Sequence, residues 1–171
     1  FHAFASILQQ DLPLLASLPE LLGRVNLGGT AIGTGINAPA HYQELALAAL
    51  SRISHNHIQA APDLIAATSD MGDFVLVSGY LKRTATKLSK IANDLRLLSS
   101  GPRAGLNEIH LQARQPGSSI MPGKVNPVIP EAMNMAAFQV IANDLAITLA
   151  ADAGQFQLNA MEPLIAFKLF D

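Results

Sequence analysis

An apolar seam with a seven-residue period constrains the fold of this chain more than any other feature. Two interleaved series form the seam: Phe74, Leu81, Leu88 and Leu95, and Val77, Thr84, Ile91 and Leu98. No proline interrupts residues 64–101, so the pattern predicts one helix from about residue 64 to about residue 99. Such a helix would be roughly 50 Å long and could bury its seam only against antiparallel neighbours.

The rest of the chain also has the spacing of helices. The expected helices cover residues 1–22, 45–58, 64–99, 132–151 and 155–170. Pro13 is expected to bend the first of them, and Pro127 and Pro130 lie where the fourth would begin. That fourth helix is apolar nearly all round, as a helix in the middle of a bundle should be. The predicted fold class is therefore all-α, a bundle of long antiparallel helices.

The amino-acid composition excludes several classes of protein and of binding partner. The chain is 50% apolar with a mean hydropathy of +0.29, which excludes a disordered chain. It has no run of about 18 uncharged apolar residues, so burial against other subunits is the expected reason for this apolar excess. The net charge of −2, without a basic run, speaks against nucleic-acid or membrane partners. The absence of cysteine excludes disulfides and thiolate sites and fits a cytoplasmic location.

The two ends suggest that the domain continues beyond the chain. Position 1 is Phe, in a segment that already has helical spacing, and the chain stops inside the apolar run EPLIAFKLFD. We therefore expect residues 1–171 to be one helical domain, truncated at both ends relative to a longer polypeptide.

Residues 101–126 lack helical periodicity, and a loop of that length in a compact domain is usually functional. Its last part, GSSIMPGKVNP (residues 117–127, the signature segment), holds Ser118, Ser119, Lys124 and Asn126 ahead of a helix start. A lysine cation, an amide donor and free N–H groups at a helix N-terminus together make a carboxylate receptor, with the hydroxyls as candidate proton carriers. A solvated Gly/Ser/Pro loop is the alternative interpretation.

The signature segment resembles the signature of the superfamily that contains aspartase, fumarase, argininosuccinate lyase and adenylosuccinate lyase. The segments NLGGTAIGTGINA, LKRTATKLSKIANDLRLLSSGPRAGLNEI and AADAGQFQLNAMEPLI also resemble the aspartase/fumarase branch, so the resemblance covers nearly the whole chain. It implies the central helical domain of that fold. It also implies a homotetramer in which four central domains share a helical core and each active site draws on three subunits.

Three positions favour the aspartase side of this branch. Asn107 precedes Glu108, Pro130 precedes Glu131, and Glu162 stands in NAMEP where fumarases typically have lysine. The implied reaction is the reversible deamination of L-aspartate to fumarate and ammonia. Fumarase, and a catalytically silent helical scaffold, remain the alternatives.

The resemblance also implies roles for single residues. Ser118 is expected to be the general base that removes the β-carbon proton, leaving an enediolate-like intermediate. The substrate-binding residues are expected to be Ser119, Ile120, Met121, Lys124 and Asn126. Glu131 has a supporting role, either beside an active-site histidine or as a favourable acid at a helix N-terminus. This mechanism requires a small dicarboxylate substrate and neither a metal nor an organic cofactor.

Two weaker motifs have ordinary structural interpretations. GTGINA, residues 33–38, fits a dinucleotide-binding pattern, but helices surround it instead of the required βαβ unit. His55 and His57 form a pair without an evident third ligand, so we expect no metal site there.

Overall fold

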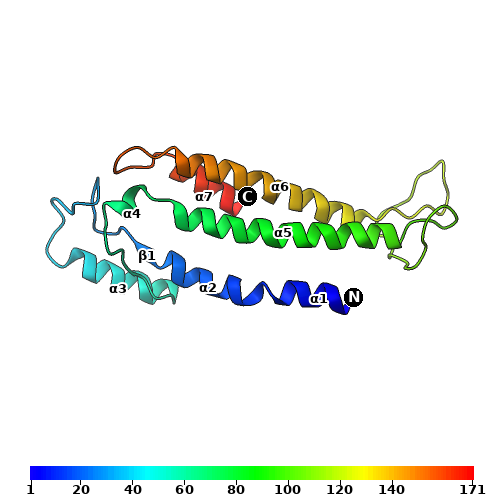
Figure 1. Ribbon diagram of the computed structural model, residues 1–171, viewed down its shortest axis with the longest axis horizontal. Helices are drawn as coiled ribbons and strands as arrows, with labels where there is room; N and C mark the ends of the chain where they lie inside the picture. Colours follow the sequence, from blue (N-terminus) through cyan, green and yellow to red (C-terminus); the bar gives the residue numbers. More distant parts are fainter. The chain divides into compact units, whose positions relative to one another are not determined.

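The computed structural model describes all 171 residues, and nearly all of its regular structure is helical (Figure 1). The helices are α1 (His2–Gln9), α2 (Leu12–Leu22), α3 (Tyr42–Ser54), α4 (Ala66–Ser69), α5 (Gly72–Leu98), α6 (Val128–Asp152) and α7 (Glu162–Phe170). Two short strands, β1 (Arg24–Val25) and β2 (Gln59–Ala60), pair in parallel. The all-α prediction is confirmed.

The chain divides into two compact units. The first unit comprises residues 1–9 and 81–142, and the second comprises residues 10–80 and 143–171. Parts of α5 and α6 belong to each unit, so the two long helices pack against each other within both.

In the second unit, α5 and α6 surround a small apolar core. The buried residues of this core are Met71, Ile147, Ala150 and Ile165, with Phe74, Val75, Ala151 and Leu169 packed against them. The buried Ser78 hydroxyl donates a 2.9 Å hydrogen bond to Asp144 Oδ1. Because residues 71–75 pack on residues 147–151 while Ser78 reaches back to Asp144, the two helices run antiparallel, as predicted.

In the first unit, side-chain hydrogen bonds join the helices. The buried Asn134 of α6 donates from Nδ2 to Ser89 Oγ at 2.8 Å and to the Ser89 carbonyl at 3.2 Å. Lys87 Nζ donates a 2.7 Å hydrogen bond to the carbonyl of Ile7, in the last turn of α1. A cation at a helix C-terminus satisfies a free carbonyl and complements the helix dipole. These contacts anchor α1 and α6 on α5.

The predicted helix over residues 64–99 is wrong in its first part. Helix α4 ends at Ser69, and α5 begins only at Gly72. Asp70 between them has an extended backbone, and its Oδ1 accepts a 2.9 Å hydrogen bond from the Gly72 amide. The carboxylate thus satisfies one of the free N–H groups of a new helix start, which apolar periodicity alone does not reveal.

The most deeply buried line on α5 also differs from the predicted seam. Ser78, Ala85, Ser89 and Ala92 are buried, whereas Leu81 of the predicted seam is exposed. Each of these buried residues directly follows a seam residue, namely Val77, Thr84, Leu88 or Ile91, and Val77 of the seam is buried as well. Small side chains on the packed face allow a close approach of neighbouring helices.

Other helix boundaries shift by a few residues. The predicted bend near Pro13 is a break, because α1 ends at Gln9 and Pro13 lies in the first turn of α2. Helix α3 ends at Ser54, where His55 takes a left-handed backbone with φ 56°. Residues 155–158 form an isolated bridge, so α7 starts later than predicted, with Pro163 in its first turn.

Helix α6 buries both polar and apolar residues on its packed face and exposes most of its large apolar side chains. By length and composition it could cross a membrane, with 25 residues and a hydropathy of 1.2. Its polar residues Asn134, Asn143 and Asp144 are nevertheless buried within the chain and hydrogen-bonded there. The prediction of a helix apolar all round is therefore corrected. Ala137, Ile147 and Ala150 are buried beside the polar residues, whereas most of the larger apolar side chains of α6 are exposed.

Candidate active site

The predicted loop is confirmed, because no helix or strand lies between Leu98 and Val128. Its first part folds back on the end of α5. The amides of Glu108 and Ile109 both donate to the carbonyl of Leu98, at 2.9 and 3.3 Å, and the Asn107 amide donates to Ser100 at 2.7 Å. These bonds satisfy carbonyls that a helix C-terminus leaves free and anchor the beginning of the loop.

The signature segment forms two successive turns. The Met121 amide donates to the Ser118 carbonyl at 3.3 Å, and the Lys124 amide donates to the Met121 carbonyl at 3.2 Å. Gly123 has a φ of 81°, a left-handed conformation that glycine adopts without strain. A Cβ at Gly117 would lie 2.3 Å from the Lys124 carbonyl oxygen, which no side chain could tolerate. The glycine therefore lets the segment fold back on itself, with Lys124 beside the residue that precedes Ser118.

The hydroxyl of Ser118 has a backbone donor. Its Oγ accepts a 3.2 Å hydrogen bond from the amide of Ile120, and the side chain is half-buried. A hydrogen bond donated to an oxygen favours its anionic form. Because a neutral serine is a weak base, this contact supplies one of the interactions that the predicted role of Ser118 requires.

The remaining predicted residues lie along the segment and at the start of α6. Ser119, Met121 and Lys124 are exposed, and the Ile120 side chain is 87% exposed. Glu131 is half-buried in the first turn of α6, where its amide donates to the Pro127 carbonyl. The structure thus brings Ser118, Ile120 and Lys124 into one doubled turn and places Glu131 on the helix that follows it.

Asn126 lies at the wall of a small cavity. The cavity has a volume of about 200 Å³ and is bounded by the end of α5, the start of α6 and the residues just before the signature segment. Arg114 lines the same cavity. Arg114 stands outside the signature segment, and its only sequence signal is a positive charge three residues ahead of Gly117.

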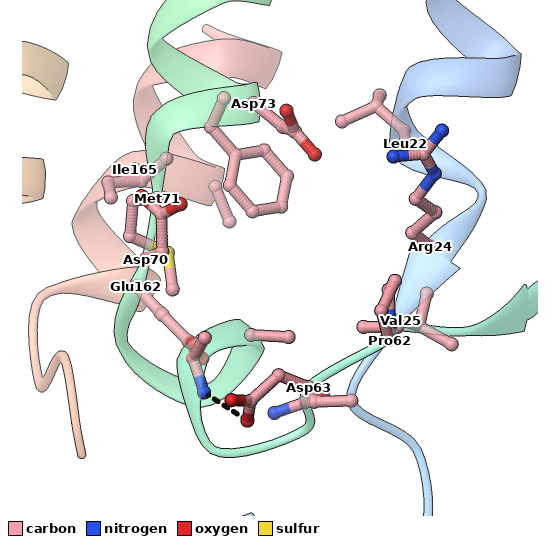
Figure 2. Close-up of a pocket in the computed structure, with 16 residues that line it drawn as sticks. Leu22, Arg24, Val25, Pro62, Asp63, Asp70, Met71, Asp73, Glu162 and Ile165 are labelled. Carbon is pink, nitrogen blue, oxygen red and sulfur yellow. Dashed lines mark hydrogen bonds between the residues drawn. The ribbon is translucent and has the colours of Figure 1, made fainter.

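A second and larger cavity holds none of the predicted site residues. It measures about 550 Å³, and Figure 2 shows Arg24 on one wall and Asp73 on the other. Acidic side chains line it, but each belongs to a helix start. Asp63 Oδ1 accepts from the Ile65 and Ala66 amides, Asp73 lies in the first turn of α5, and Glu162 in that of α7. Their charges complement helix N-termini, which accounts for the acidity.

The structure holds no group of three or more His, Asp or Glu side chains placed to bind a metal ion. His55 and His57 lie directly after α3. The GTGINA motif lies between β1 and α3, so the expectation that helices surround it is corrected. The strands β1 and β2 flank α3 and pair in parallel, but each has only two residues. The motif neither directly follows β1 nor opens α3, as a dinucleotide-binding fingerprint requires.

Comparison with known proteins identifies the class to which this fold and loop belong. A family described as lyase matches residues 1–142, most of the chain, and the chain belongs to that family. Several curated relatives at high identity are named aspartate ammonia-lyase. The one from Pseudomonas aeruginosa is 71% identical over 172 residues and the one from Escherichia coli K12 is 56% identical over 171, each covering 100% of this chain. The chain spans 36% of the length of these curated relatives.

Solved structures agree on the fold. A Brucella melitensis protein described as fumarate lyase:delta crystallin bound to cobalt is 59% identical, with a TM-score of 0.93 over 98% of this chain and 36% of that one. The class II fumarase of Schistosoma mansoni is 35% identical, with a TM-score of 0.91 over 99% of this chain and 38% of that one. The resemblance to the aspartase/fumarase superfamily, and its fold, are confirmed.

Proposed function

We propose that this chain is the central domain of an enzyme that reversibly deaminates L-aspartate to fumarate and ammonia. Relatives at up to 72% identity are named aspartate ammonia-lyases. The observation that carries the proposal is the doubled turn of the signature segment. In this turn the Ile120 amide donates to Ser118 Oγ, and the backbone of Lys124 returns to lie next to Gly117. This arrangement suits proton removal next to a carboxylate.

The proposed reaction is a β-elimination. Ser118, as the alkoxide, takes a proton from the β-carbon, and the electron pair of that C–H bond moves onto the adjacent carboxylate as an enediolate-like intermediate. Collapse of this intermediate forms the C=C bond and breaks the C–N bond, so ammonia leaves and fumarate remains. Lys124 and Asn126 hold substrate carboxylate throughout, with Ser119 and the amides of Ile120 and Met121 around the developing anion. Closure of the loop over the substrate would exclude water.

We further propose that the enzyme is a homotetramer with shared active sites. The exposed face of α6 supports this: Met135, Phe138, Leu145 and Leu149 lie on one side of the helix, each more than half exposed. Apolar residues at this spacing on a long helix suit packing against other copies, and the homotetramer is the closed assembly we expect. Light scattering on the intact protein tests this, and a stable monomer would contradict it. A cytoplasmic location stays a prediction.

The supporting role of Glu131 also remains a proposal. Its half-buried place in the first turn of α6, four residues after the signature segment ends, suits either role. As an acid at a helix start it stabilises the helix, and beside a histidine from another segment it would raise the pKa of that histidine.

Fumarase is the second candidate, favoured by the 35% identical class II fumarase with the same fold. One experiment separates the candidates. Intact protein is given L-aspartate or L-malate, and fumarate is followed by its ultraviolet absorbance and ammonia by a coupled assay. We expect ammonia and fumarate in equal amounts from L-aspartate and no fumarate from L-malate. Faster fumarate formation from malate would transfer the assignment to fumarase, and no product from either would favour a silent scaffold.

A further inference from the structure

Gly117 directly precedes Ser118 and lies against the backbone of Lys124, seven residues further along the chain. A Cβ at Gly117 would lie 2.3 Å from the carbonyl oxygen of Lys124 and 3.3 Å from its carbonyl carbon. Ordinary contact for a Cβ begins at 3.4 Å, so a side chain here would have to move the two backbones apart by about 1 Å. Because both contacted atoms belong to the backbone, no rotation of a side chain could relieve the overlap.

The turn between Gly117 and Lys124 is held by long hydrogen bonds. The Met121 amide donates to the Ser118 carbonyl at 3.3 Å, and the Lys124 amide donates to the Met121 carbonyl at 3.2 Å. Both distances lie at or just beyond the long end of the usual range for N–H···O bonds. The side chains of Met121 and Lys124 are exposed, so they do not pack the turn together. A methyl group added at Gly117 would therefore open the turn without unfolding the helices on either side.

The proposed reaction depends on the separation that this turn sets. Ser118 must reach a proton on the carbon next to a carboxylate, while Lys124 holds carboxylate of the same four-carbon molecule. A cation near the serine also favours its alkoxide form, because a nearby positive charge lowers the pKa of a hydroxyl. Both requirements limit the distance between base and cation, and a displacement of about 1 Å can cost roughly 100-fold in rate.

From this geometry we infer that Gly117 is a positioning residue of the proposed active site. Because it has no side chain, it sets how closely the backbone of Lys124 approaches Ser118, and so the distance between the base and the cation. It acts through these two residues and makes no contact with substrate. The inference rests on the proposed function, because it concerns the geometry of the same site.

Gly117→Ala, made in the intact protein, tests the inference, and Gly79→Ala is the control. Gly79 lies in α5, where a Cβ would meet no atom within 4 Å, so this replacement adds a methyl group without an overlap. Steady-state assays give kcat and KM for L-aspartate, and calorimetry gives the affinity for succinate, a dicarboxylate that does not react. Thermal unfolding gives the melting temperature. The pH dependence of kcat/KM is measured as well, because it reports the ionisation of the base.

We expect Gly117→Ala to lower kcat by roughly 100-fold and to change the succinate affinity by less than about threefold, because Lys124 and Asn126 still bind carboxylate. The limb of the pH profile that reports the base should move to higher pH, because the cation lies further from the alkoxide. The melting temperature should stay unchanged. Gly79→Ala should leave turnover, succinate affinity and the pH profile as they are in the unsubstituted protein.

Three results would overturn the inference. The first is a kcat for Gly117→Ala within about threefold of the unsubstituted value. The second is an unshifted pH profile. The third is a lower melting temperature with equal losses of turnover and of succinate affinity, since Gly117 would then have a structural role alone.

Assays with L-malate beside L-aspartate separate this inference from the proposed function. A protein that forms fumarate from malate and not from L-aspartate, with the expected loss of turnover and shift in the pH profile in Gly117→Ala, would keep the inference and reject the aspartase assignment. Deamination of L-aspartate that is unaffected by Gly117→Ala would do the reverse.

Discussion

Helix α6 directly follows the signature segment in the chain, but different interactions determine the structures of the two regions. The segment exposes most of its side chains and is shaped by turn hydrogen bonds and by Gly117, which allows the approach of the Lys124 carbonyl. Helix α6 instead buries its polar residues in hydrogen bonds to neighbouring elements, such as Asn134 to Ser89 and Asp144 to Ser78. The polar side chains of the segment are thus accessible to a substrate, whereas those of the helix form hydrogen bonds between helices.

This difference predicts that the two regions separate activity from stability. An exposed side chain contributes little to the free energy of unfolding, because folding changes its surroundings little. A buried side chain in α6 contributes through packing or through hydrogen bonds that water cannot replace. Substitutions in the segment should therefore change turnover or binding with an unchanged melting temperature. Substitutions on the packed face of α6 should do the opposite.

The largest expected effect is on turnover, in Ser118→Ala. Removing the base should lower kcat for L-aspartate by about three orders of magnitude. The affinity for succinate and the melting temperature should change little, because a base acts on a C–H bond and contributes little to binding a resting ligand. Steady-state kinetics, calorimetry and thermal unfolding check the three quantities. Near-normal turnover would show that Ser118 is not the base and make Ser119 the next candidate.

Lys124→Ala should have its effect on binding. Losing the charged partner should weaken succinate binding by about 2–4 kcal/mol, because a carboxylate of the ligand is left desolvated without a cation. Calorimetry on the intact protein measures this, with Lys82→Ala on α5 as the control cation outside the signature segment. A loss of less than about twofold in affinity would remove Lys124 from the proposed receptor.

Ile147→Ala tests the expectation that a substitution on the packed face of α6 changes stability. Ile147 is 1% exposed in the core of the second unit, so its truncation should lower the free energy of unfolding by about 2–4 kcal/mol. The matched control is Ile120→Ala, at a side chain that is 87% exposed, which should lower it by less than about 0.5 kcal/mol. Denaturant unfolding measures both changes. Equal destabilisation by the two variants would remove the distinction between the regions.

The smallest expected effect concerns Asp171, after the end of α7. A hydrogen bond from Asn143, together with a hydrogen bond and the charge of Lys168, holds the pKa of the Asp171 carboxyl below its usual value. A lowered pKa contributes stability that is present above the unfolded-state pKa and is lost as the pH falls through the folded-state pKa. Asn143→Ala and Lys168→Met should each raise the pKa of Asp171, as an NMR titration would detect. Because the carboxyl is exposed, the effect on stability should be slight.

Sequence periodicity predicted the long helices because burial leaves a regular apolar pattern. It missed the break at Asp70, because the carboxylate that starts α5 satisfies a backbone amide, an interaction independent of apolar spacing. It also missed the buried polar face of α6, because Asn134 and Asp144 have partners that lie 45 and 66 residues away in the chain. Long-range hydrogen bonds of this kind leave no local signal.

Some features of the candidate site could likewise be predicted from the sequence, and others could not. The signature segment is continuous in the chain, so its residues could be selected from their order alone. The role of Gly117 became apparent only from the close approach of the Lys124 carbonyl. The place of Arg114 at the same cavity as Asn126 could not be predicted, because it depends on how the loop folds against α5 and α6.

Ser118 is proposed to move the β-carbon proton, and the reverse reaction tests this role most directly. Intact protein is incubated with fumarate and ammonia in D₂O, and NMR follows deuterium at C3 of the aspartate that forms. A single base delivers its deuteron to one face of the double bond, so the unsubstituted protein should give aspartate with one deuterium at C3, as one diastereomer. Ser118→Ala should form no such product above background. The same singly deuterated diastereomer, formed at the unsubstituted rate by Ser118→Ala, would contradict the account.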